Sequence, residues 1–230
     1  MPQITVLFDA SGTLVTPRRS FRELLLSGGR WDIENPEASI QHALTSMGTD
    51  SLWPEDEPDP DLRLKGWYAF VETAIARSGG VTDSTRCLRA AESILDPANY
   101  TDYPDVLSCL ENLRTDHRVR AIGLLSNFDP WLREILDLLG LTRYFDHLSI
   151  SGETGYAKPD PQAVLHAAAA LGSELKDTVL VGDSMVVDGG AARAAGIRLI
   201  LIDRTGTMNY PDATVISSLE QLPDVLELVG

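Results

Sequence analysis

The strongest constraint on the fold is an alternation of strand-like and helix-like segments over about the last 130 residues. Short apolar runs at Val119–Leu125, Val179–Val181 and Ile197–Ile202 have the composition of buried β-strands. Between them, Trp131–Leu139 and Pro161–Leu171 carry apolar residues at helical spacing. Strands that alternate with helices at this pitch form a parallel sheet with helices on both faces. The sequence therefore predicts an α/β protein with a Rossmann-like parallel sheet core.

The N-terminal region divides into a strand and a helical insert. The apolar run Ile4–Phe8 has the character of the later strands, whereas Leu62–Arg77 and Arg86–Ile94 have helical patterns with no strong strand between them. We therefore expect the first strand to join the C-terminal half. The predicted domains are a core of residues 1–16 and 99–230, and a mostly helical domain of residues 17–98.

Composition limits the partners that the chain can bind. The 230 residues have a formal net charge of −15, which disfavours nucleic acid. The chain has no apolar run of about 18 residues and no signal-peptide pattern, so we expect no membrane span. The two cysteines, Cys87 and Cys109, form neither a metal-binding spacing nor a disulfide pattern. We expect a reducing, cytoplasmic setting, and the oligomeric state stays open.

Three aspartates follow predicted strands and suggest a metal site. Asp9 ends the first apolar run, and Asp183 and Asp188 follow Val179–Val181. Ligands of open parallel sheets bind beyond the carboxyl ends of the strands. There, Asp9 has the chemistry of a nucleophile, and the three carboxylates have the hard oxygen ligands that Mg²⁺ prefers. The alternative is that each aspartate only forms a turn.

Other polar residues at strand ends suit an anionic substrate. Ser126 and the amide of Asn127 can hold the oxygens of a phosphoryl group, and Lys158 can offset the charge of that group and of Asp9. Alternatively, Ser126 and Asn127 cap a helix, and Lys158-Pro159 lies in a loop that leads into one. We expect Asp129 to cap the helix that begins near Trp131.

With these motifs the sequence resembles the haloacid dehalogenase (HAD) superfamily of hydrolases. The motifs occur in the family's order along the whole core, and the insert matches the family's helical-cap class. The stretch from Ser126 to Pro161 is most similar to the HDHD3-like (REG-2-like) subgroup. The residues that carry the resemblance are Asp9-Ala10-Ser11-Gly12-Thr13, Ser126-Asn127, Lys158-Pro159, Gly182-Asp183 and Asp188.

The resemblance implies a role for each motif. Asp9 would be the nucleophile that forms a covalent aspartyl intermediate, and Lys158 would stabilise charge. The substrate, a small phosphorylated metabolite, would be bound by Thr13, Ser126, Asn127 and Lys158. The Mg²⁺ cofactor would be held by Asp9, Asp183, Asp188 and the backbone carbonyl of Ser11.

Ser11 departs from the family's phosphatases, which carry an aspartate at this position. That aspartate protonates the leaving group and then activates water. Near neutral pH a serine hydroxyl is too weak as an acid and too weak as a base for either step, and the loss of such a group removes roughly 10²- to 10⁴-fold in rate. The backbone carbonyl needed for Mg²⁺ is still present.

Four functions remain possible. The first is a Mg²⁺-dependent phosphatase with a weak acid/base step, and the second is a 2-haloacid dehalogenase, whose halide leaves without a proton. Ile202–Thr207 (IDRTGT) resembles a segment of that dehalogenase branch, but Asp183 would place an unneeded charge near its substrate. The third is phosphonate hydrolysis with Lys65 as a Schiff-base residue. The fourth is a phosphate-binding or regulatory protein with little turnover.

Overall fold

The computed structural model describes residues 3–49, 57, 59–207 and 210–229. Contacts within the chain define two compact units. The core unit contains residues 1–16 and 101–230, and the helical unit contains residues 17–100. Each unit is described by itself below. Among the described residues, no helix combines the length and the apolar composition needed to cross a membrane.

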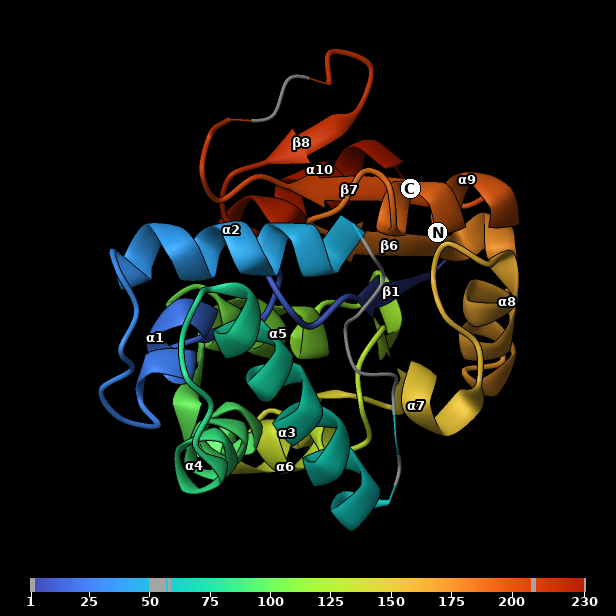
Figure 1. Ribbon diagram of the computed structural model, residues 1–230. Helices are drawn as coiled ribbons and strands as arrows, with labels where there is room; N and C mark the ends of the chain where they lie inside the picture. Colours follow the sequence, from blue (N-terminus) through green and yellow to red (C-terminus); the bar gives the residue numbers. More distant parts are fainter. Residues whose placement is uncertain (1–2, 50–56, 58, 208–209, 230) are drawn as a thin grey trace. The chain divides into compact units, whose positions relative to one another are not determined.

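Six strands of the core unit form one sheet in which every neighbouring pair is parallel (Figure 1). In their order across the sheet they are β5 (His147–Ile150), β4 (Val119–Ser126), β1 (Ile4–Phe8), β6 (Thr178–Gly182), β7 (Arg198–Ile202) and β8 (Thr214–Ile216). The predicted α/β fold with a parallel Rossmann-like sheet is confirmed. Strands β5 and β8 were not predicted, because four and three residues are too few to show a hydrophobic period.

The register of β1 places the candidate site. All five residues of β1 are buried, as expected of a strand covered on both faces. Phe8 lies in register with Leu124 of β4 and with Val181 of β6. The three central strands therefore end at the same edge of the sheet. The predicted site residues near these ends are Asp9, Ser126 and Asp183.

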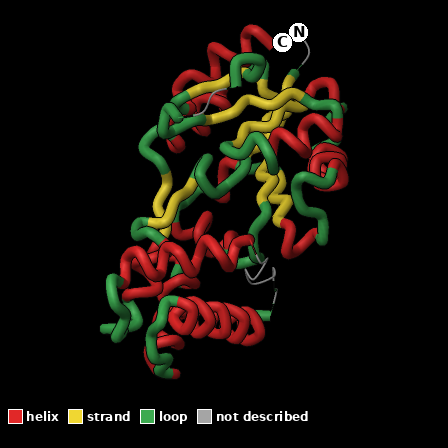
Figure 2. Tube along the Cα trace, turned by 45° about the horizontal axis from the view of Figure 1, so that its top comes forward, coloured by secondary structure: helices red, strands yellow, loops and turns green. Residues whose placement is uncertain are grey.

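Helices cover both sides of this sheet (Figure 2). They are α5 (Val106–Thr115), α6 (Leu132–Leu138), α7 (Ser151–Thr154), α8 (Pro161–Ala170), α9 (Asp188–Ala195) and α10 (Leu222–Val229), with short 3₁₀ helices at Thr142–Tyr144, Leu175–Asp177 and Leu219–Gln221. Ala163, Ala167 and Ala191 lie in one buried cluster with Leu7 and Leu180 of the sheet. Alanines let α8 and α9 approach the strands closely.

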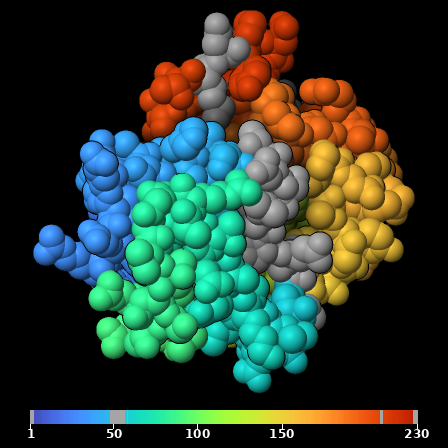
Figure 3. Space-filling view, viewed as in Figure 1, coloured from blue at the N-terminus to red at the C-terminus, as the bar shows by residue number. Residues whose placement is uncertain are grey.

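In the described residues of the helical unit, whose surface runs from blue to green in Figure 3, there are four α-helices. They are α1 (Phe21–Leu26), α2 (Pro36–Thr49), α3 (Pro60–Arg77) and α4 (Ser84–Leu95), with a 3₁₀ helix at Pro97–Asn99. They share a separate hydrophobic cluster. The rings of Phe21, Trp67 and Phe70 lie 5.5–5.7 Å apart in tilted or edge-on contacts, which are favourable for aromatic pairs. Strands β2 (Val15–Pro17) and β3 (Tyr100–Asp102) pair where the chain leaves and re-enters the core unit.

The core cluster makes one prediction for stability. Leu7 is fully buried in the middle of the sheet, whereas Leu138 on α6 is 60 % exposed. Leu7→Ala should lower the free energy of unfolding by about 2–5 kcal/mol, because it leaves a cavity between β1 and the alanine-rich helices. Leu138→Ala removes the same atoms from the surface and should change the stability by less than about 0.5 kcal/mol. Urea unfolding of both variants measures the difference, and equal effects would contradict the proposed core.

Candidate active site

The centre of the candidate site is the buried ammonium group of Lys158. Its Nζ lies 2.6 Å from Oδ1 of Asp9 and 2.6 Å from Oδ1 of Asp188. Lys158, Asp9 and Asp188 are 4 %, 7 % and 1 % exposed, so this is an ion triad largely removed from water. Buried charges are tolerated only when they are paired and hydrogen-bonded. Lys158 therefore holds the two carboxylates in one place.

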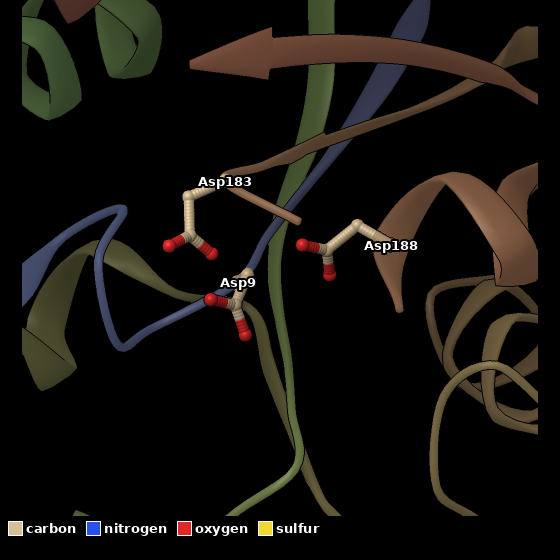
Figure 4. Close-up of side chains that lie close together, drawn as sticks. All are labelled: Asp9, Asp183 and Asp188. Carbon is tan, nitrogen blue, oxygen red and sulfur yellow. The ribbon is translucent and has the colours of Figure 1, made fainter. Parts of the chain in front are cut away.

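Asp183 adds a third carboxylate to this group, as Figure 4 shows. One oxygen from each of Asp9, Asp183 and Asp188 lies within 4.8 Å of the others. Ligand oxygens around one Mg²⁺ lie about 2.1 Å from the ion, and therefore within about 4.2 Å of each other. The three side chains are close to that spacing and have the right chemistry. They therefore have the ligand chemistry and the close spacing that a divalent cation requires.

The same crowding shifts the pKa values of the site. Burial raises the pKa of Asp9, and Asp188 adds to this rise while Lys158 opposes it. Burial together with the charges of Asp9 and Asp188 raises the pKa of Asp183 to about 6. Burial alone would lower the pKa of Lys158, but the two carboxylates outweigh it and the pKa is raised. The raised pKa values mean that the site disfavours the ionised forms of Asp9 and Asp183 and favours the charged form of Lys158.

Two glycines make room for these carboxylates. A Cβ atom on Gly12 would lie 2.1 Å from Oδ2 of Asp183, and a Cβ atom on Gly182 would lie 2.4 Å from Cγ of Asp188. Gly12 also has a φ of +80°, a left-handed conformation that side chains disfavour. The resemblance had singled out both glycines, but their role in receiving the carboxylates is visible only in the structure.

Ser126 and Asn127 act on the triad in different ways. Ser126 is buried, and its hydroxyl donates to Oδ1 of Asp9 at 3.3 Å. Asn127 is exposed, and its side chain forms two hydrogen bonds with the backbone of Lys158. Its Nδ2 donates to the Lys158 carbonyl at 2.7 Å, and its Oδ1 accepts from the Lys158 amide at 2.8 Å. Asn127 therefore fixes the loop that presents the lysine.

Ser11 and Thr13 lie in the turn after β1. Ser11 is exposed, and a lone bridge links its backbone to Val15. Thr13 is completely buried, and its hydroxyl has no hydrogen-bond partner among the residues described in the structure. The structure thus gathers Asp9, Ser126, Lys158, Asp183 and Asp188 into one cluster. The catalytic, substrate-binding and metal-binding roles of all these residues stay predictions.

Two features of the site region differ from, or add to, the expectations. Helix α6 begins at Leu132, with Trp131 at its N-cap and no side-chain cap, so the predicted cap by Asp129 is wrong. Asp129 is buried, and its carboxylate accepts from the indole of Trp131 at 3.4 Å. The backbone N–H of Ser184 donates to Oδ2 of Asp188 at 2.9 Å. That support was missed because backbone donors have no sequence signature.

Comparison with known proteins identifies the class of enzyme. A model of the haloacid dehalogenase-like hydrolases matches residues 5–196, and the chain belongs to this family. It is 34 % identical to haloacid dehalogenase-like hydrolase domain-containing protein 3 of Danio rerio, over 99 % of this chain and 98 % of that protein, which confirms the HDHD3-like subgroup. It is also 34 % identical to a phosphoserine phosphatase of Thermus thermophilus, over 79 % and 74 % of the two chains.

The fold is shared with solved structures of the family. The L-2-haloacid dehalogenase of Xanthobacter autotrophicus superposes with a TM-score of 0.71 over 98 % of both chains, at 19 % identity. Phosphatases occur among the sequence relatives and a dehalogenase among the structures. The family match therefore establishes a hydrolase, and the shared fold does not choose between these two reactions.

The raised pKa of Asp183 predicts that this residue destabilises the metal-free protein. An acid whose folded pKa of about 6 lies above its ordinary 3.8 favours folding only when it is protonated. Its contribution to stability is therefore gained as the pH falls from above about 6 to below about 4. With a chelator at pH 7, Asp183→Asn should increase the free energy of unfolding by about 1 kcal/mol, allowing for partial exposure.

Denaturant unfolding across this pH range measures the effect. The difference between wild type and Asp183→Asn should disappear near pH 4. The exposed Asp212→Asn removes the same charge away from the triad and should leave the stability unchanged. A lower stability of Asp183→Asn at pH 7 would contradict the prediction.

The contact between Gly12 and Asp183 predicts a coupling between the two positions. Gly12→Ala should cost more than Gly140→Ala, because Gly140 has a similar φ of +67° but nothing within 4 Å of an added Cβ. Gly140→Ala should cost about 1–2 kcal/mol, and Gly12→Ala at least about 1 kcal/mol more. The excess should vanish in an Asp183→Ala background. A double-mutant cycle from urea unfolding measures this coupling, and strictly additive effects would disprove the contact.

Proposed function

We propose that the protein is a Mg²⁺-dependent phosphatase that acts on a small phosphorylated metabolite through a covalent intermediate on Asp9. The observation that carries the proposal is the charge of the site. The cluster contains three carboxylates and one ammonium group, which contacts two of them, and this leaves a formal charge of −2. A divalent cation would neutralise that charge, and an anionic phosphoryl group could then enter. The phosphatase names of the sequence relatives support the same reading.

The proposed mechanism gives Asp9 the first step. Lys158 and Ser126 both donate to Oδ1 of Asp9, which leaves Oδ2 to attack phosphorus. The new bond joins this oxygen to phosphorus as the bond to the leaving oxygen breaks. Water then attacks the phosphorus, the bond to Asp9 breaks, and phosphate is released. Lys158 would hold charge on Asp9 and on the phosphoryl group throughout.

The same residues would hold the cation. Asp9, Asp183, Asp188 and the carbonyl of Ser11 are the proposed ligands, and bound Mg²⁺ would neutralise phosphoryl charge. Ser11 cannot protonate the leaving oxygen or take a proton from water. Leaving groups that are stable as anions would therefore react best. The helical unit is proposed to be the cap that selects among substrates.

The other candidates fit less well. A haloacid would bring its own carboxylate to a site of formal charge −2, and such a reaction has no use for three clustered acids. Lys65, the lysine needed for phosphonate chemistry, is exposed on α3, as expected of a surface lysine. Slow turnover by a phosphate-binding protein is the second candidate, because Ser11 leaves hydrolysis of the intermediate without a base.

Substitutions at Ser11 test the proposal. Acetyl phosphate and an alkyl phosphate should be compared with and without Mg²⁺. Wild type should prefer acetyl phosphate, since carboxylate leaves without a proton, and Asp9→Asn should be inactive. Ser11→Asp should raise turnover of the alkyl phosphate at least about tenfold, because it supplies the missing acid. Ser11→Asn is the control, as it matches aspartate in size but cannot transfer a proton.

Each other outcome has a separate meaning. If wild type and Ser11→Asp are both inactive although folded, the phosphatase proposal fails. Release of halide from 2-haloacids without Mg²⁺ would instead support the dehalogenase. Equal effects of Ser11→Asp and Ser11→Asn would show that proton transfer at this position does not limit turnover.

A further inference from the structure

An arginine far along the chain holds the turn that follows the candidate nucleophile. Arg204 lies just after β7, in the Ile202–Thr207 segment. Its Nη2 donates to the backbone carbonyl of Thr13 at 2.6 Å. The two residues are separated by 191 positions. This bond ties the turn after β1 to the segment that follows β7, a different strand of the sheet.

Arg204 is itself fixed by several neighbours. Its Nη1 and Nη2 each donate to a carboxylate oxygen of Asp105 at 3.0 Å, and the guanidinium lies 3.7 Å from the centre of the Tyr103 ring. Asp105 also accepts from the hydroxyl of Ser218 and from the amide of Leu219, both at 2.9 Å. A two-pronged pair with an aromatic stack suits arginine and not lysine. The guanidinium therefore has one defined position.

The turn that Arg204 supports presents the site. The carbonyl of Ala10 accepts from the amides of Thr13, Leu14 and Val15 at 3.3, 2.8 and 2.9 Å, and the amide of Gly12 donates to Val15 at 2.9 Å. This tight loop follows Asp9 directly, contains Ser11, and places Gly12 against the Asp183 carboxylate. Its inner hydrogen bonds are local, but two backbone bonds to distant residues hold its ends: the Asp9 amide donates to the Val181 carbonyl at 2.9 Å, and the Tyr103 amide donates to the Leu14 carbonyl at 3.1 Å. The hydrogen bond from Arg204 to the Thr13 carbonyl links the middle of this loop to the segment after β7.

We propose that Arg204 is a positioning residue for the nucleophile. By holding the Thr13 carbonyl, it fixes the Ala10–Leu14 turn and thereby the placement of Asp9 and of the Ser11 carbonyl. This inference rests on the proposed phosphatase function for its effect on rate. Arg204 touches none of the reacting groups, so it acts only through the turn. A displacement of about 1 Å at a nucleophile can lower the rate about 10²-fold.

Arginine variants with a matched control test the proposal. Arg204→Gln removes both the positive charge and the planar guanidinium group that forms the two-pronged pair with Asp105. Arg204→Lys keeps the positive charge but not the guanidinium group. Arg120→Gln is the control, because Arg120 also donates to a backbone carbonyl, that of Gly172, but at the opposite end of β4 from the site. Hydrogen–deuterium exchange of the full chain reports on the turn itself. Turnover of acetyl phosphate with Mg²⁺ reports on the nucleophile.

Arg204→Gln should raise amide exchange at residues 12–15 at least tenfold and leave residues 119–126 within twofold of wild type. It should lower kcat 10- to 100-fold with less than a threefold change in KM. Arg204→Lys should give a smaller loss, and Arg120→Gln should change neither readout. Unchanged exchange at residues 12–15 in Arg204→Gln, or exchange raised equally throughout the core, would overturn the proposal.

The two proposals fail in different ways. If wild type does not turn over acetyl phosphate, the phosphatase proposal fails. The hydrogen–deuterium exchange data would still decide whether Arg204 orders the turn. An active wild type whose kcat survives in Arg204→Gln would leave the phosphatase proposal intact and remove the positioning role. Raised exchange together with a reduced kcat supports both.

Discussion

The site depends on one buried ammonium group between two carboxylates. At an effective dielectric constant of about 20, two charges no more than 4.8 Å apart repel by at least roughly 3 kcal/mol, and the oxygens of Asp9, Asp183 and Asp188 form three such pairs. Lys158 offsets part of this repulsion through its contacts of 2.6 Å with Asp9 and Asp188. Burial, together with the charges of Asp9 and Asp188, raises the pKa of Asp183. The negative charge that Lys158 does not offset favours binding of a cation at this cluster.

The parallel sheet makes this cluster possible. Because β1 lies between β4 and β6 in register, three strands end side by side, and each contributes to the site from a distant part of the sequence. The backbone is close-packed there, and only glycine at positions 12 and 182 leaves space for the carboxylates of Asp183 and Asp188. Arg204, just after β7, contacts the turn after β1 through the carbonyl of Thr13. One loop therefore contacts both Arg204 and the carboxylate of Asp183.

The sequence predicted those parts that carry a local signal. Strands β1, β4, β6 and β7 and helix α8 have clear periods, and Asp9, Ser126, Lys158 and Asp183 follow recognisable motifs. The sequence did not predict β5, because His147–Ile150 contains two polar residues. It predicted a helix cap by Asp129, whose carboxylate instead accepts a hydrogen bond from the indole of Trp131. In sequence, the segment IDRTGT shows only a resemblance to the dehalogenase branch of the family. Its contact with Thr13 joins residues 191 apart, and no local pattern reports such a distance.

Ser11 has different consequences for the two halves of the proposed reaction. In the first half, the need for an acid depends on the leaving group, so a substrate with a stable anion avoids the defect. In the second half, water must attack the phosphorylated Asp9 whatever the substrate was, and Ser11 offers no base to assist it. A better leaving group would therefore speed formation of the covalent intermediate without speeding its breakdown. A site that keeps its nucleophile, its lysine and its acidic cluster but lacks this base is suited to hold a phosphoryl group longer than a fast phosphatase would.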